Sequence, residues 1–207
     1  MIYPKQNRLK HWILDTYVHA IVKRHFHEVN VIGEMALQGR SVLLLANHFS
    51  VWDGLILYHL NQQITGKKFH VMLLEDTARR EPMLKYGGAF SVSKGSRDVL
   101  VTLDYAAQLL ADPQNMVLIF PQGKLHSNFI DQLTFERGVL RVMERAAGKF
   151  SLHFATTFVE NFKHKKPTAN VYLHNNEQTV FNSIGELEQA CQRHYDVARA
   201  RQTQITV

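Results

Sequence analysis

The sequence predicts an α/β fold with a mixed, largely parallel central sheet flanked by helices and preceded by an N-terminal amphipathic helix. Segments with strand patterning alternate with segments of helical periodicity along the chain, which is typical of βαβ units. Residues 41–46 and 116–120 are continuous apolar runs, as expected for strands buried on both faces. These observations together favour a parallel sheet covered by helices.

The first predicted element is a helix over residues 6–27, whose broad apolar face is flanked by lysines, arginines and histidines. Such a helix suits the interface of an anionic membrane, where basic residues meet lipid headgroups. It equally suits packing against a globular domain. Both interpretations are kept as hypotheses.

The other elements follow from apolar runs, alternation and turn residues. Strands are predicted at residues 28–33, 41–46, 69–74, 89–93, 116–120, 152–159 and 170–173. Helices are predicted at residues 52–61, 77–86, 97–110, 138–147 and 183–201, the last opening on Ser183-x-x-Glu186, the spacing of a capping box. No repeat or Gly/Ser-rich linker divides the chain, so residues 30–207 are expected to form one domain after the N-terminal segment 1–29.

Composition limits the classes of function. The 24 lysines and arginines exceed the 18 aspartates and glutamates, and the formal charge of +6 predicts an anionic partner: nucleic acid, a membrane surface or a phosphate-bearing substrate. Cys191 is the only cysteine, so a reducing compartment is expected and no metal site built on thiolates. No signal peptide and no apolar run of about 18 to 20 residues is visible, which predicts a soluble or peripheral protein.

Polar residues follow two predicted strands, where binding sites of parallel sheets form. His48 and Asp53 come after the run 41–46, and residues 122–124 come after the run 116–120. Positions five apart on one helix point about 140° apart, so His48 and Asp53 meet only if His48 precedes the helix and Asp53 lies in its first turn. Ser50 is then the predicted N-cap.

This arrangement has two interpretations. Asp53 either satisfies only the amides at the helix start, or it also orients His48 as a general base. No G-x-S-x-G motif is present, so a serine-hydrolase triad is not expected.

Residues 47–53 (NHFSVWD) resemble the first block, N-H-x-S-x-x-D, of the glycerolipid acyltransferases, which include glycerol-3-phosphate and lysophosphatidate acyltransferases. Residues 88–94 (GAFSVSK) are similar to the second block. Residues 120–127 (FPQGKLHS) are similar to the third, F-P-E-G-T-R-S, and residues 135–138 (FERG) to its sequel. The proline of the fourth block is absent from 152–159. The resemblance covers about residues 30–165, within the predicted acyltransferase domain 30–207.

The resemblance implies that His48 removes a proton from an acceptor hydroxyl while Asp53 orients the imidazole. The acyl donor would be a thioester, acyl-CoA or acyl-carrier protein, with no metal and no further cofactor. Substrate binding would fall to Lys94, Arg97, Gln122, Gly123 and Lys124.

The third block departs from the family pattern. Gln122 stands where the family has glutamate, and Lys124 and His126 stand near the place of its phosphate-gripping arginine. An arginine binds phosphate through a bidentate fork, whereas lysine gives a point contact. Gln122 can still accept hydrogen bonds from loop amides through its carbonyl oxygen. The acceptor is therefore expected to be a glycerol phosphate or another hydroxylated lipid or polyol.

The leading hypothesis is an acyltransferase that is cytoplasmic and peripheral on the inner face of the membrane. The alternative is a catalytically degenerate module that binds lipid or acyl chains. A nucleic-acid partner is not expected, because the chain lacks helix-turn-helix, RNP and zinc-finger signatures.

Overall fold

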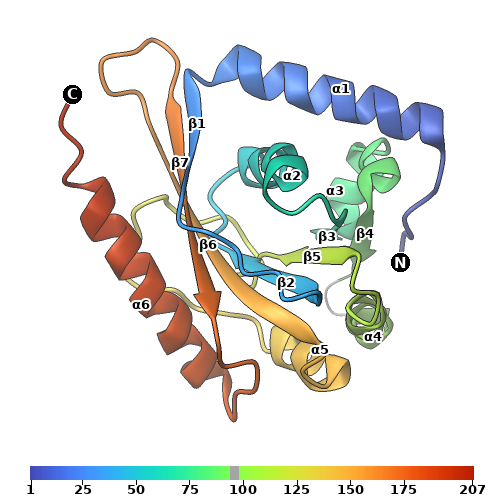
Figure 1. The fold of residues 1–207 in the computed structure, drawn as a ribbon. Helices are drawn as coiled ribbons and strands as arrows, with labels where there is room; N and C mark the ends of the chain where they lie inside the picture. The colour runs from blue at the N-terminus through green and yellow to red at the C-terminus, as the bar shows by residue number, and fades with distance from the viewer. Residues whose placement is uncertain (94–97) are drawn as a thin grey trace.

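A seven-stranded sheet in the order β1-β7-β6-β2-β5-β3-β4 runs through the molecule (Figure 1). The computed structural model describes residues 1–93 and 98–207. The strands are β1 (Glu28–Ile32), β2 (Ser41–Ala46), β3 (Lys68–Leu74), β4 (Ala89–Val92), β5 (Asn115–Ile119), β6 (Phe150–Glu160) and β7 (Thr168–Asn176). Neighbouring strands are parallel except for the β6–β7 pair, which is antiparallel. The predicted fold class is confirmed.

Helices cover both faces of the sheet (Figure 1). They are α1 (Arg8–His25), α2 (Trp52–Ile64), α3 (Glu75–Arg80), the 3-10 turn η1 (Leu84–Gly87), α4 (Asp98–Leu109), α5 (Gly138–Ala146) and α6 (Ile184–Gln202). Alternate residues of β2 enter two separate cores: Val42 and Leu44 pack with α1 and α2, and Leu43 and Leu45 with α4, α5 and α6. This two-sided burial explains the continuous apolar run 41–46.

Helix α1 packs against the body of the protein and also exposes apolar side chains. Its N-cap Asn7 accepts a hydrogen bond from the Lys10 amide at 3.0 Å. Leu14, Val18 and Val22 are buried in the core that α1 shares with α2. Its exposed large apolar side chains are Leu9, Trp12, Ile13 and Tyr17. Among the described residues, no helix has both the length and the hydropathy needed to cross a membrane.

The helix predicted over residues 77–86 is wrong as a single element. The structure has α3, which ends at Arg80, and then the separate turn η1. Pro82 accounts for the break, because proline has no amide to donate and disfavours helical geometry in the residue before it. After η1, Gly88 has φ +92°, and a Cβ there would lie 1.8 Å from the Phe69 carbonyl oxygen.

The predicted capping box of the last helix is only half formed. The Ser183 hydroxyl accepts a hydrogen bond from the Glu186 amide at 3.2 Å. The Glu186 carboxylate accepts from the Asn182 amide at 2.9 Å rather than from that of Ser183. The other elements lie close to their predicted positions, but β6 and β7 are longer because they pair along their whole length.

Candidate active site

The site lies where β2 and β5 end. These strands are parallel neighbours, with Leu45 opposite Ile119. The chain therefore leaves the sheet at Asn47 and at Phe120 on the same edge, as the sequence predicts for the first and third motifs. Helix α2 begins close by, at Trp52.

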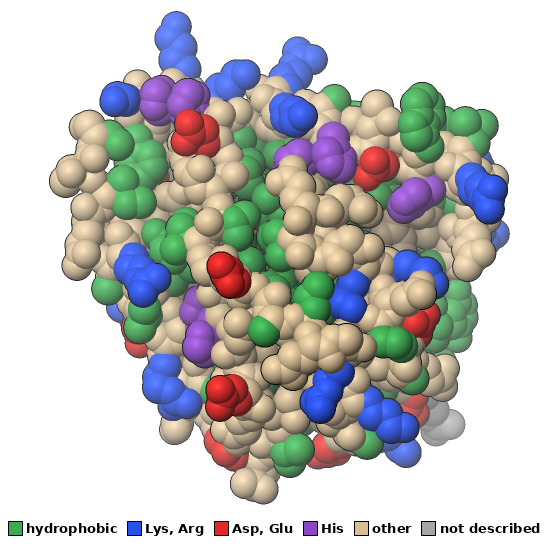
Figure 2. Space-filling model, viewed as in Figure 1, with side chains coloured by type: hydrophobic (Ala, Val, Ile, Leu, Met, Phe, Trp, Pro, Cys, Tyr) green, Lys and Arg blue, Asp and Glu red, His purple; other side chains and the backbone are tan. Residues whose placement is uncertain are grey.

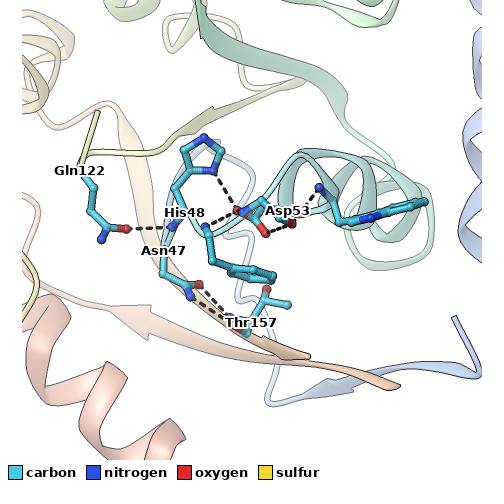
Figure 3. A network of polar contacts seen from close by, with 8 residues as sticks. Asn47, His48, Asp53, Gln122 and Thr157 are labelled. Carbon is cyan, nitrogen blue, oxygen red and sulfur yellow. Dashed lines mark hydrogen bonds and ion pairs between the residues drawn. The ribbon is translucent and has the colours of Figure 1, made fainter. Parts of the chain in front are cut away.

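His48 and Asp53 are in direct contact (Figure 3). The Nδ1 atom of His48 lies 2.8 Å from Oδ2 of Asp53, whose side chain is buried. The same oxygen accepts hydrogen bonds from the amides of Phe49 at 2.7 Å and Ser50 at 3.0 Å. These donors fix the carboxylate, and the carboxylate in turn requires a proton on Nδ1.

The start of α2 differs slightly from the prediction. The cap position is held by Val51, not by Ser50. The Ser50 hydroxyl accepts from the Trp52 amide at 3.0 Å, while Asp53 accepts from the Ser50 amide as in a capping box. One oxygen of Asp53 thus accepts hydrogen bonds from amides just before the helix and also contacts the His48 ring. Asp53 therefore both satisfies these amides and orients His48.

Two amide side chains hold the backbone of the first motif. Asn47 donates to the Thr157 carbonyl at 3.1 Å and accepts from the Thr157 amide at 2.9 Å, which extends the pairing of β2 with β6 (Figure 3). Gln122 accepts from the His48 amide at 2.8 Å. The His48 carbonyl accepts from the His126 amide at 2.9 Å. Two residues of the third block, Gln122 and His126, therefore hydrogen-bond to the backbone of His48, one at its amide and the other at its carbonyl.

The His48 ring projects from this framework toward a cavity. It stacks on Phe120, with 4.2 Å between ring centroids and 19° between planes. Its side chain is 25% exposed, although its Asp53 partner is buried. With Nδ1 bound to Asp53, Nε2 is the ring atom that can take up a proton.

The cavity has a volume of about 840 Å³ and is lined mainly by apolar side chains. Leu14 and Val18 of α1, Leu55 of α2, Val71 of β3 and Leu103 of α4 all contribute to its walls. The described part of the chain contributes four charged residues to the lining: Arg80, Glu81, Lys124 and Glu136. Arg80 was not predicted, because an exposed arginine on a short helix gives no sequence signal. Tyr58 also lines the cavity, and burial together with nearby Asp15 raises its pKa, which keeps the phenol protonated.

The residues predicted to bind substrate divide into three groups. Gly123 and Lys124 line the cavity; Gly123 has φ +65°, and its amide donates to the Phe120 carbonyl at 3.1 Å. Gln122 is buried and is not part of the cavity wall. Lys94 and Arg97 lie outside the described residues. Within residues 1–93 and 98–207, no three His, Cys, Asp or Glu side chains gather so as to hold a metal ion.

Asn47 and Thr157 are functional-site residues that sequence reasoning overlooked. Asn47 stands within the quoted motif, which is a usable signal, but its role on the backbone was not predicted. Thr157 lies 110 positions away inside a strand and gives no local signal.

Comparison with protein families identifies the family of the chain. The model of the family described as Acyltransferase matches residues 28–159, which is more than half of the chain. A search of curated proteins gave no match. The matched range contains the His48–Asp53 pair, the Gln122 motif and every strand between them, so the resemblance to acyltransferases is confirmed at the level of this family. The chain belongs to the Acyltransferase family.

Proposed function

We propose that this acyltransferase moves a fatty acyl group from an acyl thioester to a hydroxyl of a lipid or glycerol-phosphate-type acceptor, as glycerolipid acyltransferases do. The observation that carries the proposal is the 2.8 Å contact between His48 and Asp53 beside a large apolar cavity. An oriented imidazole is the usual general base near neutral pH. The pair combines an oriented base with access to this cavity.

The reaction needs one proton acceptor and a good leaving group. Nε2 of His48 takes the proton of the acceptor hydroxyl as its oxygen attacks the thioester carbonyl. The tetrahedral intermediate then collapses, the C–S bond breaks, and the thiolate takes the proton from the imidazolium. Asp53 stabilises the imidazolium between these steps. No cofactor is needed beyond acyl-CoA or acyl-carrier protein as the co-substrate.

The cavity suits an acyl chain. Its apolar walls favour burial of methylene groups at about 0.8 kcal/mol for each CH₂. Arg80 and Lys124 supply positive charge along the same walls, balanced by Glu81 and Glu136. A phosphate on the acceptor would therefore meet cations without the forked arginine of the family's third motif. An acceptor without charge, such as a polyol or a lipid hydroxyl, is also compatible with walls that carry two cations and two carboxylates.

We also propose that the protein works in the cytoplasm, peripherally bound to the inner face of the membrane. The exposed apolar side chains of α1 support this, because aromatic and aliphatic residues beside lysines favour a lipid interface. Deleting the helix is an unsuitable test, since Leu14, Val18 and Val22 belong to the core. Replacing Leu9, Trp12 and Ile13 by serine leaves the core intact and should release the protein from vesicles in a flotation assay.

The catalytic proposal is tested with purified protein, a labelled acyl thioester and a panel of hydroxylated lipids. The expected result is an acylated acceptor and free thiol. His48→Ala should lower kcat by about 10²- to 10⁴-fold, as expected for loss of a general base. Circular dichroism and thermal unfolding should match those of the unsubstituted protein.

Two outcomes contradict the proposal. An unchanged rate in folded His48→Ala protein rules out this histidine as the base. Tight thioester or lipid binding without turnover across the acceptor panel favours the alternative, a degenerate binding module.

A further inference from the structure

Two basic segments that are far apart in the sequence meet at one end of α1. The last turn of this helix carries Lys23 and Arg24, and the loop between β6 and β7 carries Lys163, Lys165 and Lys166. Figure 1 shows this loop beside the point where α1 runs into β1, and Figure 2 shows lysine and arginine side chains gathered over that edge. These five cations are called the basic patch below.

Specific contacts hold the two segments together. The His27 amide donates to the Pro167 carbonyl at 2.8 Å. The rings of His27 and His164 stack with 3.6 Å between centroids and 17° between planes. These contacts fix the end of α1 and the β6–β7 loop relative to each other, so the basic patch is part of the folded structure.

The charges of the basic patch are largely uncompensated. All five side chains are exposed, and none forms an ion pair with a described residue. The nearby acids contact neighbours other than these cations: Glu28 lies 3.8 Å from His27, and Glu160 accepts a hydrogen bond from Gln202 at 3.1 Å. The helix dipole accounts for cations in the last turn of α1. It does not account for the three lysines of the loop.

An apolar surface continues from the basic patch along α1. Leu9, Trp12, Ile13 and Tyr17 are each at least 45% exposed. Trp12 and Lys23 are eleven residues apart, and so are Ile13 and Arg24. Eleven residues make three full turns of an α-helix plus about 20°, so the two members of each pair point in nearly the same direction from the helix axis. The apolar residues and the cations of α1 thus share one side of the helix. Aromatic rings beside cations can also stack on unpaired bases, but the aliphatic side chains of Leu9 and Ile13 offer nothing to a nucleic acid. A bilayer interface accommodates the apolar side chains and the cations together.

We propose that the basic patch binds the headgroups of anionic phospholipids in a bilayer and so sets the orientation in which α1 lies on the membrane. The inference rests on the proposed action at a lipid surface and adds the lipid class and the second binding element, the β6–β7 loop. Cations within a Debye length of an anionic surface are attracted to it, and the attraction falls as salt is added.

Vesicle flotation with the full chain tests the proposal. The protein should float with vesicles of mixed phosphatidylcholine and phosphatidylglycerol far more than with phosphatidylcholine alone, and less as salt rises. The triple variant Lys163→Gln, Lys165→Gln, Lys166→Gln should lower the partition coefficient by about one hundredfold, at roughly fivefold for each charge.

A matched control removes three exposed cations that lie away from the β6–β7 loop: Arg145→Gln near the end of α5, Lys149→Gln just before β6 begins, and Arg193→Gln in the middle of α6. This variant has the same net charge as the loop variant and should bind vesicles like the unsubstituted protein. Equal loss in the two triple variants would reduce the effect to net charge and overturn the proposal. So would equal binding to neutral and mixed vesicles, or tighter binding to duplex DNA than to the mixed vesicles.

Failure of this proposal is distinguishable from failure of the catalytic one. His48→Ala should float normally while its kcat falls by about 10²- to 10⁴-fold. The loop variant should keep its turnover of short-chain, detergent-solubilised substrates while losing flotation. If the loop variant folds but loses this turnover, the loop lysines act in the reaction itself and not only in binding the membrane, which contradicts the proposal.

Discussion

The side-chain oxygen of Gln122 accepts a hydrogen bond from the backbone amide of His48 at 2.8 Å, across 74 positions of sequence. The contact joins the loops that follow β2 and β5, and Gln122 is only 4% exposed. A glutamate in the family pattern would offer the same acceptor with a charge. The amide oxygen holds His48 without burying a second carboxylate near Asp53, which favours a positioning role for Gln122 over direct contact with substrate.

Replacing Gln122 by leucine should weaken both the fold and the reaction. The His48 amide would lose its acceptor in a partly buried loop, at a cost of about 1 kcal/mol in the free energy of unfolding. Displacement of His48 should lower kcat more than it raises KM. Gln122→Glu should retain most of the kcat, because it keeps the acceptor. Steady-state kinetics and urea denaturation check both variants, and a full kcat in Gln122→Leu would contradict the positioning role.

Asp53 should respond differently to asparagine and to alanine. Asparagine can place its oxygen where Oδ2 stands and keep the bonds from His48, Phe49 and Ser50, but it lacks the charge that stabilises an imidazolium. We expect Asp53→Asn to unfold like the unsubstituted protein and to lose roughly 10²- to 10⁴-fold in kcat. Asp53→Ala should also lose stability, because buried amides lose their acceptor. Equal stability of the two variants would show that the amides find other partners.

Gly54 offers a direct probe of the cavity. It lies in the first turn of α2 and lines the cavity, and a Cβ there would meet nothing within 4 Å. Gly54→Ala should raise stability by about 0.8 to 1 kcal/mol through helix propensity. Gly54→Leu should fill space beside His48 and lower kcat/KM for long-chain thioesters more than for acetyl thioester. An equal loss of kcat/KM for the long-chain and the acetyl thioester would show that the acyl chain does not bind in this cavity.

Buried histidines should make the fold less stable in mild acid. Burial lowers the pKa of His153 to about 4, and likewise that of His194, whereas in the unfolded chain both groups titrate near 6.5. Between about pH 6.5 and pH 4 the unfolded chain therefore binds more protons, so the free energy of unfolding decreases as pH falls through this range. For His153 the loss is roughly 3 kcal/mol. Urea denaturation at pH 7.5 and pH 4 measures it.

His153→Leu should remove part of this pH dependence. His153 is buried with no well-formed hydrogen bond to either ring nitrogen, Asn175 being a weak partner. A leucine of similar size buries no polar atom, so stability at pH 7.5 should be kept or increased. A variant whose stability falls with acid as steeply as before would show that other groups dominate the acid response.

Much of the fold follows from local pattern. The apolar run of β2, the strand–helix alternation and the spacing from His48 to Asp53 depend on residues that are close in sequence, and all three are confirmed in the structure. The break between α3 and η1 also has a local cause, Pro82, which the helical pattern around it concealed.

The sequence by itself determined the fold class, the acyltransferase resemblance and the spacing that allows His48 to meet Asp53, because each depends on short-range periodicity or on a motif. The structure decided between the two interpretations of that spacing by placing His48 in contact with Asp53. Only the tertiary structure decided that Thr157 and Gln122 hold the first motif, that Arg80 faces the cavity, and that the β6–β7 lysines join those of α1. These contacts depend on the order and direction of the strands in the sheet. That order results from burying two cores at once, a property of the whole chain and not of any one segment.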